Sequence, residues 1–127
     1  MPLRSARGTR CLVQSDSVVQ AIETLLNARG NSDLAAIERT LTDGYAKALS
    51  LEAERWRIQR RIGEVASTLG RGDVAAKTKE IVSLAQRLEA ADRDLIALRN
   101  LLGPLRGRAD AARAGAARAG AARAATA

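Results

Sequence analysis

The chain has 127 residues, with no phenylalanine, no histidine, one tryptophan, one tyrosine and one cysteine. Leucine, isoleucine, valine and alanine supply almost all of the apolar content, which favours one small helical domain over a sheet with an aromatic core. The absence of histidine removes the commonest general base and metal ligand, and a single cysteine, Cys11, excludes an internal disulfide.

The formal net charge of +7 is concentrated at the two ends of the chain. Residues 1–15 contain three arginines and no acid, and residues 103–127 contain five arginines and one aspartate. The segment between them therefore has as many acidic as basic residues, 13 of each. Residues 1–15 are expected to form a flexible basic arm, and residues 16–102 a neutral folded body.

Targeting signals are not evident in the sequence. No window approaches the roughly 18 continuous apolar residues of a membrane span. The N-terminal sequence MPLRSARGTRCLV lacks the apolar core of a secretory signal peptide. We therefore expect a cytoplasmic protein without a membrane partner, in which Cys11 is an incidental thiol.

The first predicted element is a short helix at about residues 17–29. The sequence SVVQ, which starts at Ser17, has the form of a capping box, in which a hydroxyl and the side chain three residues later satisfy free backbone amides. Ile22, Leu25 and Leu26 then give the helix one apolar face.

Two longer helices are predicted at about residues 33–69 and 74–102. Gly70 suits the left-handed cap of the first helix and Asp73 the N-cap of the second. Gly103–Pro104 is expected to end the second helix, because proline lacks the amide that the helix needs. Apolar positions recur along both helices at alternating steps of three and four, with interruptions at a glycine, an arginine and a lysine. These seam positions are Leu34, Ile37, Leu41, Gly44, Ala48, Leu51, Arg55, Ile58, Ile62, Val65 and Leu69, then Val74, Lys77, Ile81, Leu84, Leu88, Ala91, Leu95, Leu98 and Leu102.

The predicted fold is therefore all-α, an antiparallel coiled-coil helical hairpin preceded by the short helix. Charges beside the seam select one register of the hairpin, in which Lys47 faces Asp94, Glu54 faces Arg87 and Arg61 faces Glu80. Each exposed ion pair contributes only about 0.2–1 kcal/mol, so the pairs select the register while burial of the seam supplies the stability.

The same register makes three further predictions. Glu38 is expected to face Arg99. Arg55 and Lys77 fall on the seam itself, and we expect their stems to lie along the apolar residues while their charged ends reach water.

Tyr45, Leu49 and Trp56 form a partly apolar stripe away from the hairpin seam. The first helix is too short to cover Leu49 and Trp56, so these three residues are candidates for a protein interface, with a second copy in a homodimer or with another protein. The alternative is that the Trp56 ring packs under Arg60 or under the N-terminal arm.

Residues 103–127 form an Ala/Arg/Gly-rich tail that we expect to be disordered, because these residues bury little surface. Removal of residues 104–127 should then leave the fold intact. Arginine recurs every fifth residue. Because an α-helix has 3.6 residues per turn, these side chains would point to different sides of a helix and would not form one basic stripe. These arginines are Arg108, Arg113, Arg118 and Arg123.

Two functions from different classes are compatible with the sequence, and neither is enzymatic. No nucleotide-binding, zinc or calcium motif occurs, so no cofactor, metal or small-molecule substrate is expected. The first hypothesis is a helical interaction protein: an adaptor, an assembly factor or a regulatory subunit. The second is an architectural nucleic-acid-binding protein whose phosphate contacts come from the four tail arginines with Arg57 and Arg60.

Overall fold

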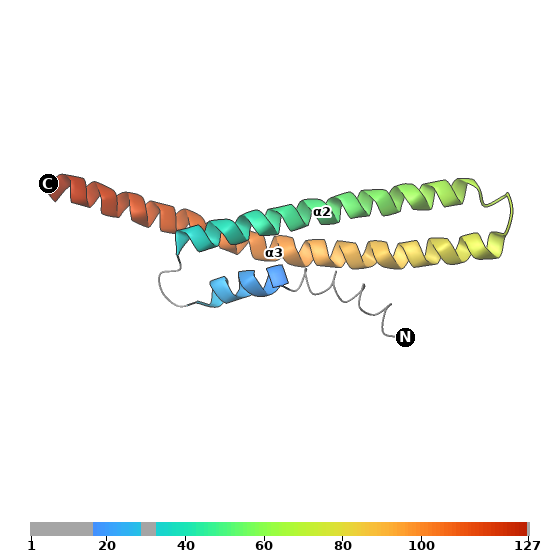
Figure 1. Ribbon diagram of the computed structural model, residues 1–127, viewed down its shortest axis with the longest axis horizontal. Helices are drawn as coiled ribbons and strands as arrows, with labels where there is room; N and C mark the ends of the chain where they lie inside the picture. Colours follow the sequence, from blue (N-terminus) through green and yellow to red (C-terminus); the bar gives the residue numbers. More distant parts are fainter. Residues whose placement is uncertain (1–16, 29–32, 127) are drawn as a thin grey trace. The chain divides into compact units, whose positions relative to one another are not determined.

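The computed structural model describes residues 17–28 and 33–126, and within them every element is a helix. A first helix covers residues 17–27, α2 runs from Leu34 to Ser67 and α3 from Val74 to Thr126 (Figure 1). The all-α prediction is confirmed. The predicted arm at residues 1–15, with Cys11, lies outside the described residues.

Side chains of aspartate start both long helices. The amide of Ala35 donates to Asp33 Oδ1 at 3.1 Å, and the amide of Ala76 donates to Asp73 Oδ1 at 3.2 Å. Asp73 is thus the N-cap that the sequence predicts, and Asp33 plays the same part for α2.

In the turn between α2 and α3, the glycine with the left-handed backbone conformation is not the one predicted. Gly72, with φ of 80°, takes the left-handed conformation that the sequence analysis assigned to Gly70. The Lys77 ammonium bends back over this turn and donates to the carbonyls of Thr68 and Arg71. The Thr68 carbonyl also accepts from the amide of Arg71 at 2.9 Å, so the Lys77 ammonium binds turn carbonyls where the sequence predicted that it would reach water.

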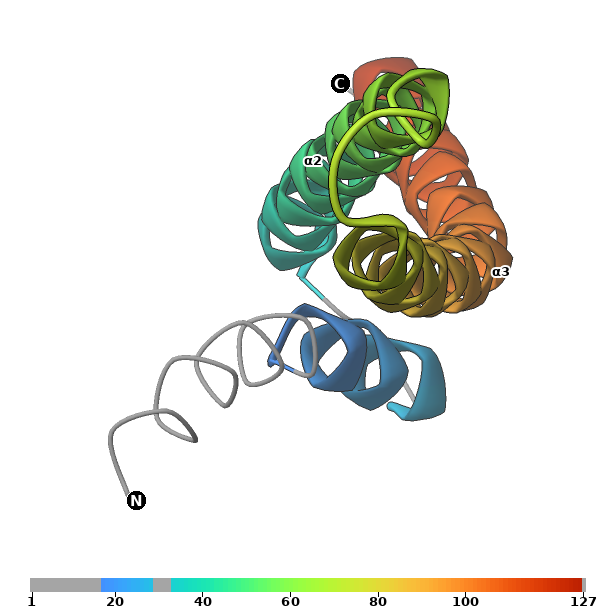
Figure 2. The same ribbon diagram turned by 90° about the vertical axis from the view of Figure 1, so that its right-hand side faces the viewer.

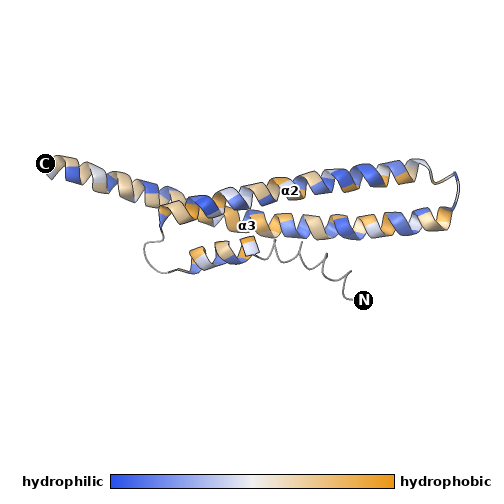
Figure 3. Cartoon of the chain, viewed as in Figure 1, coloured by the Kyte–Doolittle hydropathy of each residue, from blue (hydrophilic) through white to orange (hydrophobic). Residues whose placement is uncertain are grey.

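The described chain divides into two compact units, and both long helices contribute to each. One unit, here the two-helix unit, comprises Ala48–Ala97. The other, the three-helix unit, combines the chain up to Lys47 with the chain from Leu98. Hydrophilic and hydrophobic residues alternate along the helices of both units (Figure 3). No helix in the described ranges carries an apolar stretch long enough to cross a membrane.

In the two-helix unit, α2 and α3 run antiparallel from the turn (Figures 1 and 2). Two of the predicted ion pairs are present: Arg61 Nη2 lies 2.9 Å from Glu80 Oε1, and Arg87 Nη2 lies 3.9 Å from Glu54 Oε1. More than half of the apolar seam positions are buried, whereas Ile62, Leu69, Ile81 and Leu88 are half-buried and Val74, the first seam residue on α3, is exposed. The buried apolar residues of this unit are Ala48, Leu51, Ile58, Val65, Leu84, Ala91 and Leu95.

Arg55 interrupts this seam and is paired there. Its guanidinium forms an ion pair with Asp92 across the two helices. The contact brings opposite charges together, but the buried Nε atom is not oriented to form a hydrogen bond. Arg55 is therefore neutralised at the edge of the seam, where the sequence analysis predicted that its charge would reach water.

In the three-helix unit, the first helix packs with the start of α2 and with α3. A Cβ atom added to Gly44 would lie 2.5 Å from Leu102 Cδ2 and 3.6 Å from Ile22 Cδ1, so the missing side chain lets the helices approach closely. This unit buries Ile22, Ile37, Leu41, Leu98, Leu102, Leu105 and Ala109.

The predicted helix end at Gly103–Pro104 is wrong, because α3 continues through both residues to Thr126. Proline removes one backbone hydrogen bond and costs about 3 kcal/mol inside a helix. The step pattern of the seam nevertheless continues beyond it, and both Leu105 and Ala109 are 0% exposed. Burial of residues on both sides of Pro104 stabilises the helix across it.

Candidate functional site

Two residues of the stripe predicted for protein binding, Leu49 and Trp56, are exposed in the two-helix unit. Leu49 is 66% exposed and Trp56 is 60% exposed, one heptad apart on the side of α2 away from the seam. Arg60 Cζ lies 5.4 Å from the centroid of the Trp56 ring, so the alternative prediction, in which Arg60 covers the ring, also describes part of this surface. Single exposed apolar side chains are common on protein surfaces, whereas neighbouring ones form a patch that marks an interface, so Leu49 and Trp56 are a candidate site as a pair.

α3 presents a comparable pair in the same unit. Val82 and Ile96 are both more than half exposed and are two heptads apart. They lack an aromatic ring and a stacked cation, which makes them a natural internal comparison for Leu49 and Trp56.

The basic cluster around Trp56 is largely compensated. Arg60 Nε lies 3.4 Å from Glu64 Oε1, and Arg61 Nη1 lies 3.6 Å from Glu64 Oε2. The Glu80 carboxylate, through its hydrogen bond with Arg61 and then through its charge, raises the pKa of Arg61 further above its ordinary value. Arg57 is exposed, and no described residue neutralises it.

Arg108, which the sequence suggested as a candidate phosphate contact, forms a clamp inside the three-helix unit. Its guanidinium donates to the carbonyls of Leu25, Leu26 and Ala28, the last at 3.3 Å. These carbonyls end the first helix, where the helix dipole favours a positive charge.

Arg113 is also paired with acidic side chains. Of the four tail arginines suggested as phosphate contacts, only the last two are without an acid partner in the described part of the chain. Arg113 donates from Nη2 and Nε to Glu38 Oε1 at 3.1 and 3.2 Å, and from Nη1 to Asp110 Oδ1 at 3.2 Å. Glu38 thereby has a partner that the predicted register did not include. Arg118 and Arg123 lie on the exposed end of α3, where Arg118 Nε donates to the Ala114 carbonyl at 3.4 Å.

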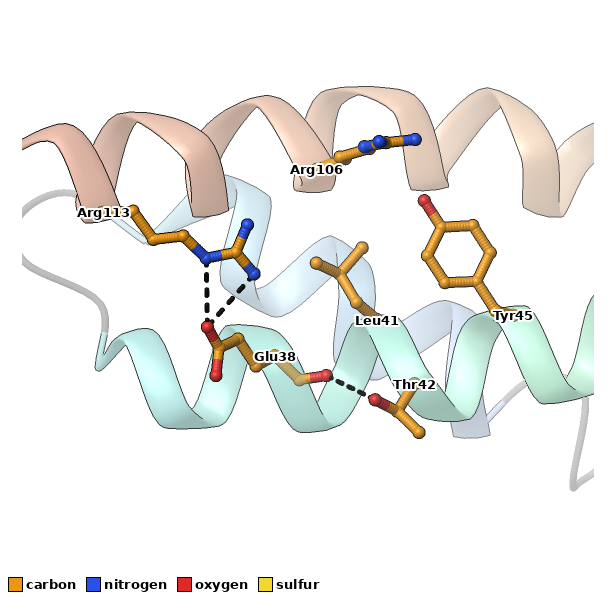
Figure 4. A pocket seen from close by; sticks show the side chains of 6 residues that line it. All are labelled: Glu38, Leu41, Thr42, Tyr45, Arg106 and Arg113. Atoms are coloured by element: carbon orange, nitrogen blue, oxygen red, sulfur yellow. Dashed lines mark hydrogen bonds and ion pairs between the residues drawn. The ribbon is translucent and has the colours of Figure 1, made fainter.

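The structure adds a groove that the sequence analysis missed. It lies in the three-helix unit between α2 and α3, has a volume of about 550 Å³ and opens to solvent (Figure 4). Tyr45, 42% exposed, stands on α2 with its hydroxyl directed toward α3, where Arg106 lies. Six side chains line the groove: Glu38, Leu41, Thr42, Tyr45, Arg106 and Arg113.

Arg106 is the distinctive residue of this groove. No carboxylate in the described part of the chain pairs with it, whereas Arg113 in the same groove contacts two. The signal for it in the sequence was the spacing of Arg99, Arg106 and Arg113, which are one heptad apart and so occupy one row of α3. The five-residue spacing in the tail concealed this seven-residue spacing.

The described ranges contain no group of three or more cysteine, aspartate or glutamate side chains placed to hold a metal ion. The chain matches no family model, and no significant similarity links it to a curated protein or to a solved structure. The proposals for a function therefore depend on two exposed surfaces, the one formed by Leu49 and Trp56 and the one at the end of α3 with Arg118 and Arg123.

Proposed function

We propose that the protein is a non-enzymatic helical interaction protein of the cytoplasm, an adaptor, an assembly factor or a regulatory subunit, that binds through Leu49 and Trp56. The observation that carries this proposal is the exposure of both side chains, 66% and 60%, on a helix whose opposite side is buried. Tryptophan and arginine are enriched among the residues that dominate binding energies, and here Arg60 lies over the Trp56 ring.

We further propose that the two-helix unit is a coiled coil that holds this surface rigid. The buried seam and the pairs Glu54–Arg87 and Arg61–Glu80 support heptad packing in one register. Cysteines at positions 58 and 81, in a Cys11→Ser background, should crosslink within one chain. Preferential crosslinking of positions 58 and 88 would show a register shifted by one heptad.

The experiment that tests the interface is a double substitution, Leu49→Ala with Trp56→Ala. Because both residues are exposed, helical content and melting temperature should stay nearly unchanged. Self-association, measured by analytical ultracentrifugation, or capture of a protein partner from the native host should be lost. The matched control is Val82→Ala with Ile96→Ala, which removes exposed apolar surface from α3 and should leave assembly intact. Equal loss in both variants, or no loss in either, would contradict the proposal.

The second candidate function is sequence-independent binding of nucleic acid by basic arms. Exposure of every residue from 113 to 126, including Arg118 and Arg123, supports an arm at this end of the chain. A helix of this length without packing partners is marginal in water, so we propose that the arm exchanges between helix and disordered chain. Engagement of Arg108 and Arg113 within the three-helix unit leaves this function with fewer contacts than the sequence suggested.

Titration with duplex and single-stranded DNA at several salt concentrations separates the two functions. For the interaction protein we expect no binding tighter than about micromolar at about 150 mM salt. Nanomolar binding that is lost on removal of residues 115–127 would favour the nucleic-acid function. That removal deletes two arginines and should reduce the salt slope by about 0.9 for each lost phosphate contact.

A further inference from the structure

The groove in the three-helix unit combines a cation that no described carboxylate pairs with, a hydroxyl and an apolar side chain. Arg106 faces it from α3, and Tyr45 directs its hydroxyl into it from α2 (Figure 4). Leu41 lies between them at the base. A guanidinium without an acid partner beside an oriented hydroxyl is complementary to an oxygen anion.

We propose that this groove binds a carboxylate side chain on an acidic segment of a partner protein. Arg106 would receive the carboxylate in its guanidinium fork, and the Tyr45 hydroxyl would donate to one of the two oxygens. An apolar side chain next to the carboxylate in the partner would lie on Leu41 and on the Tyr45 ring.

Arg113 has a different part in the same groove. Its Nε and Nη2 atoms are held by Glu38, and its Nη1 atom is held by Asp110. It therefore forms a wall with its charge already neutralised, which leaves Arg106 as the available cation among the described residues that line the groove. One available cation suits a single carboxylate better than a phosphate backbone, which is held by several cations in a row.

The charge of the surroundings favours a protein ligand for a second reason. Glu38 remains at the edge of the groove, and a polyanion that followed α3 from Arg106 toward Arg113 would meet both Glu38 and Asp110. An isolated carboxylate on a partner avoids this repulsion. The site lies within the three-helix unit and does not require that Leu49 and Trp56 form an interface.

The test uses the full chain and a short fluorescein-labelled peptide of glutamate, leucine and alanine, with fluorescence anisotropy at about 150 mM salt, where distant charges are screened. A second peptide has glutamine in place of every glutamate. We expect the glutamate peptide to bind at least about tenfold more tightly than the glutamine peptide, since a charged hydrogen bond is lost. Arg106→Gln should weaken the glutamate peptide about tenfold, and Tyr45→Phe about threefold.

Arg123→Gln is the matched control, because it removes the same charge from the exposed end of α3. It should change the affinity by less than about twofold. The Leu49→Ala, Trp56→Ala variant should retain the peptide affinity, which separates this site from the proposed interface. Equal weakening by Arg106→Gln and Arg123→Gln, or absence of peptide binding, would overturn the proposal. Binding of an oligothymidylate in preference to the peptide, weakened by Arg106→Gln, would also overturn it and indicate a phosphate site.

Discussion

The two compact units use the same helices and differ in how many helices surround each position. In the three-helix unit, Ile22, Leu105 and Ala109 are completely buried. In the two-helix unit the seam is only partly buried, and Leu49, Trp56, Val82 and Ile96 remain exposed on the outer sides of the helices. Two helices bury one stripe each, and a further helix is needed before a second side can leave water.

The same contrast appears within α3, where similar residues have opposite environments. Residues 103–112 and 113–126 are both rich in alanine, arginine and glycine. Ala109 and Arg108 belong to the three-helix unit, whereas every residue from 113 to 126 is exposed. Composition alone therefore does not separate a core segment from an arm, and the residues packed against each segment do.

The largest effect is expected from two truncations that test this division of α3. Removal of residues 104–127 deletes Leu105, Ala109 and Arg108. The sequence alone predicted that the fold would survive this truncation, and the structure predicts that it is destabilised. It should cost more than about 4 kcal/mol, since one buried leucine alone contributes about 2–5 kcal/mol and charged hydrogen bonds about 1.5–3 kcal/mol. Removal of residues 115–127 should change stability by less than about 0.5 kcal/mol. Urea unfolding followed by circular dichroism measures both.

Leu105→Ala tests the burial difference with one side chain. It should lower the free energy of unfolding by about 2–5 kcal/mol, because the residue is completely buried. Leu49→Ala is the same chemical change at an exposed position and should cost less than about 0.5 kcal/mol. Similar losses for the two variants in chemical denaturation would show that exposure does not distinguish the units.

Arg108→Ala tests the clamp on the first helix. Loss of a charged donor to the carbonyls of Leu25, Leu26 and Ala28 should cost about 1.5–3 kcal/mol. Amide hydrogen exchange should become faster in residues 17–27, while the two-helix unit keeps its protection. Arg118→Ala removes an arginine from the exposed end of α3 as a control. Unchanged protection of the first helix in Arg108→Ala would rule out the clamp.

The smallest effect compares two helical glycines, one from each unit. Gly63 has nothing within 4 Å of an added Cβ atom, so Gly63→Ala should stabilise the protein by about 0.8–1 kcal/mol through helix propensity. At Gly44 the added Cβ atom would clash with Leu102. The clash should cost at least about 1 kcal/mol, so Gly44→Ala should bring no net gain in stability. Thermal melting of both variants measures the difference. An equal gain at both positions would mean that Leu102 moves away without cost.

Local chemistry in the sequence was sufficient to predict much of the architecture. The step pattern of apolar residues predicted the buried seam, Asp73 predicted the start of α3, and charge pairing predicted Arg61 with Glu80 and Glu54 with Arg87. The heptad pattern also placed Leu49 and Trp56 away from the seam and so predicted their exposure. Each of these features depends on the spacing of residues within one or two helices, and spacing is written in the sequence.

Features that depend on a third helix or on distant partners were decided only by the tertiary structure. α3 continues through Pro104 because Leu105 and Ala109 are buried beyond it, which outweighs a local signal to stop. Arg108 is a clamp because the carbonyls that end the first helix lie within its reach. Glu38 and Asp110 hold Arg113, and no carboxylate in the described ranges pairs with Arg106. An arginine in a sequence carries its charge with it, but only the packed structure determines which acid or carbonyl will meet that charge.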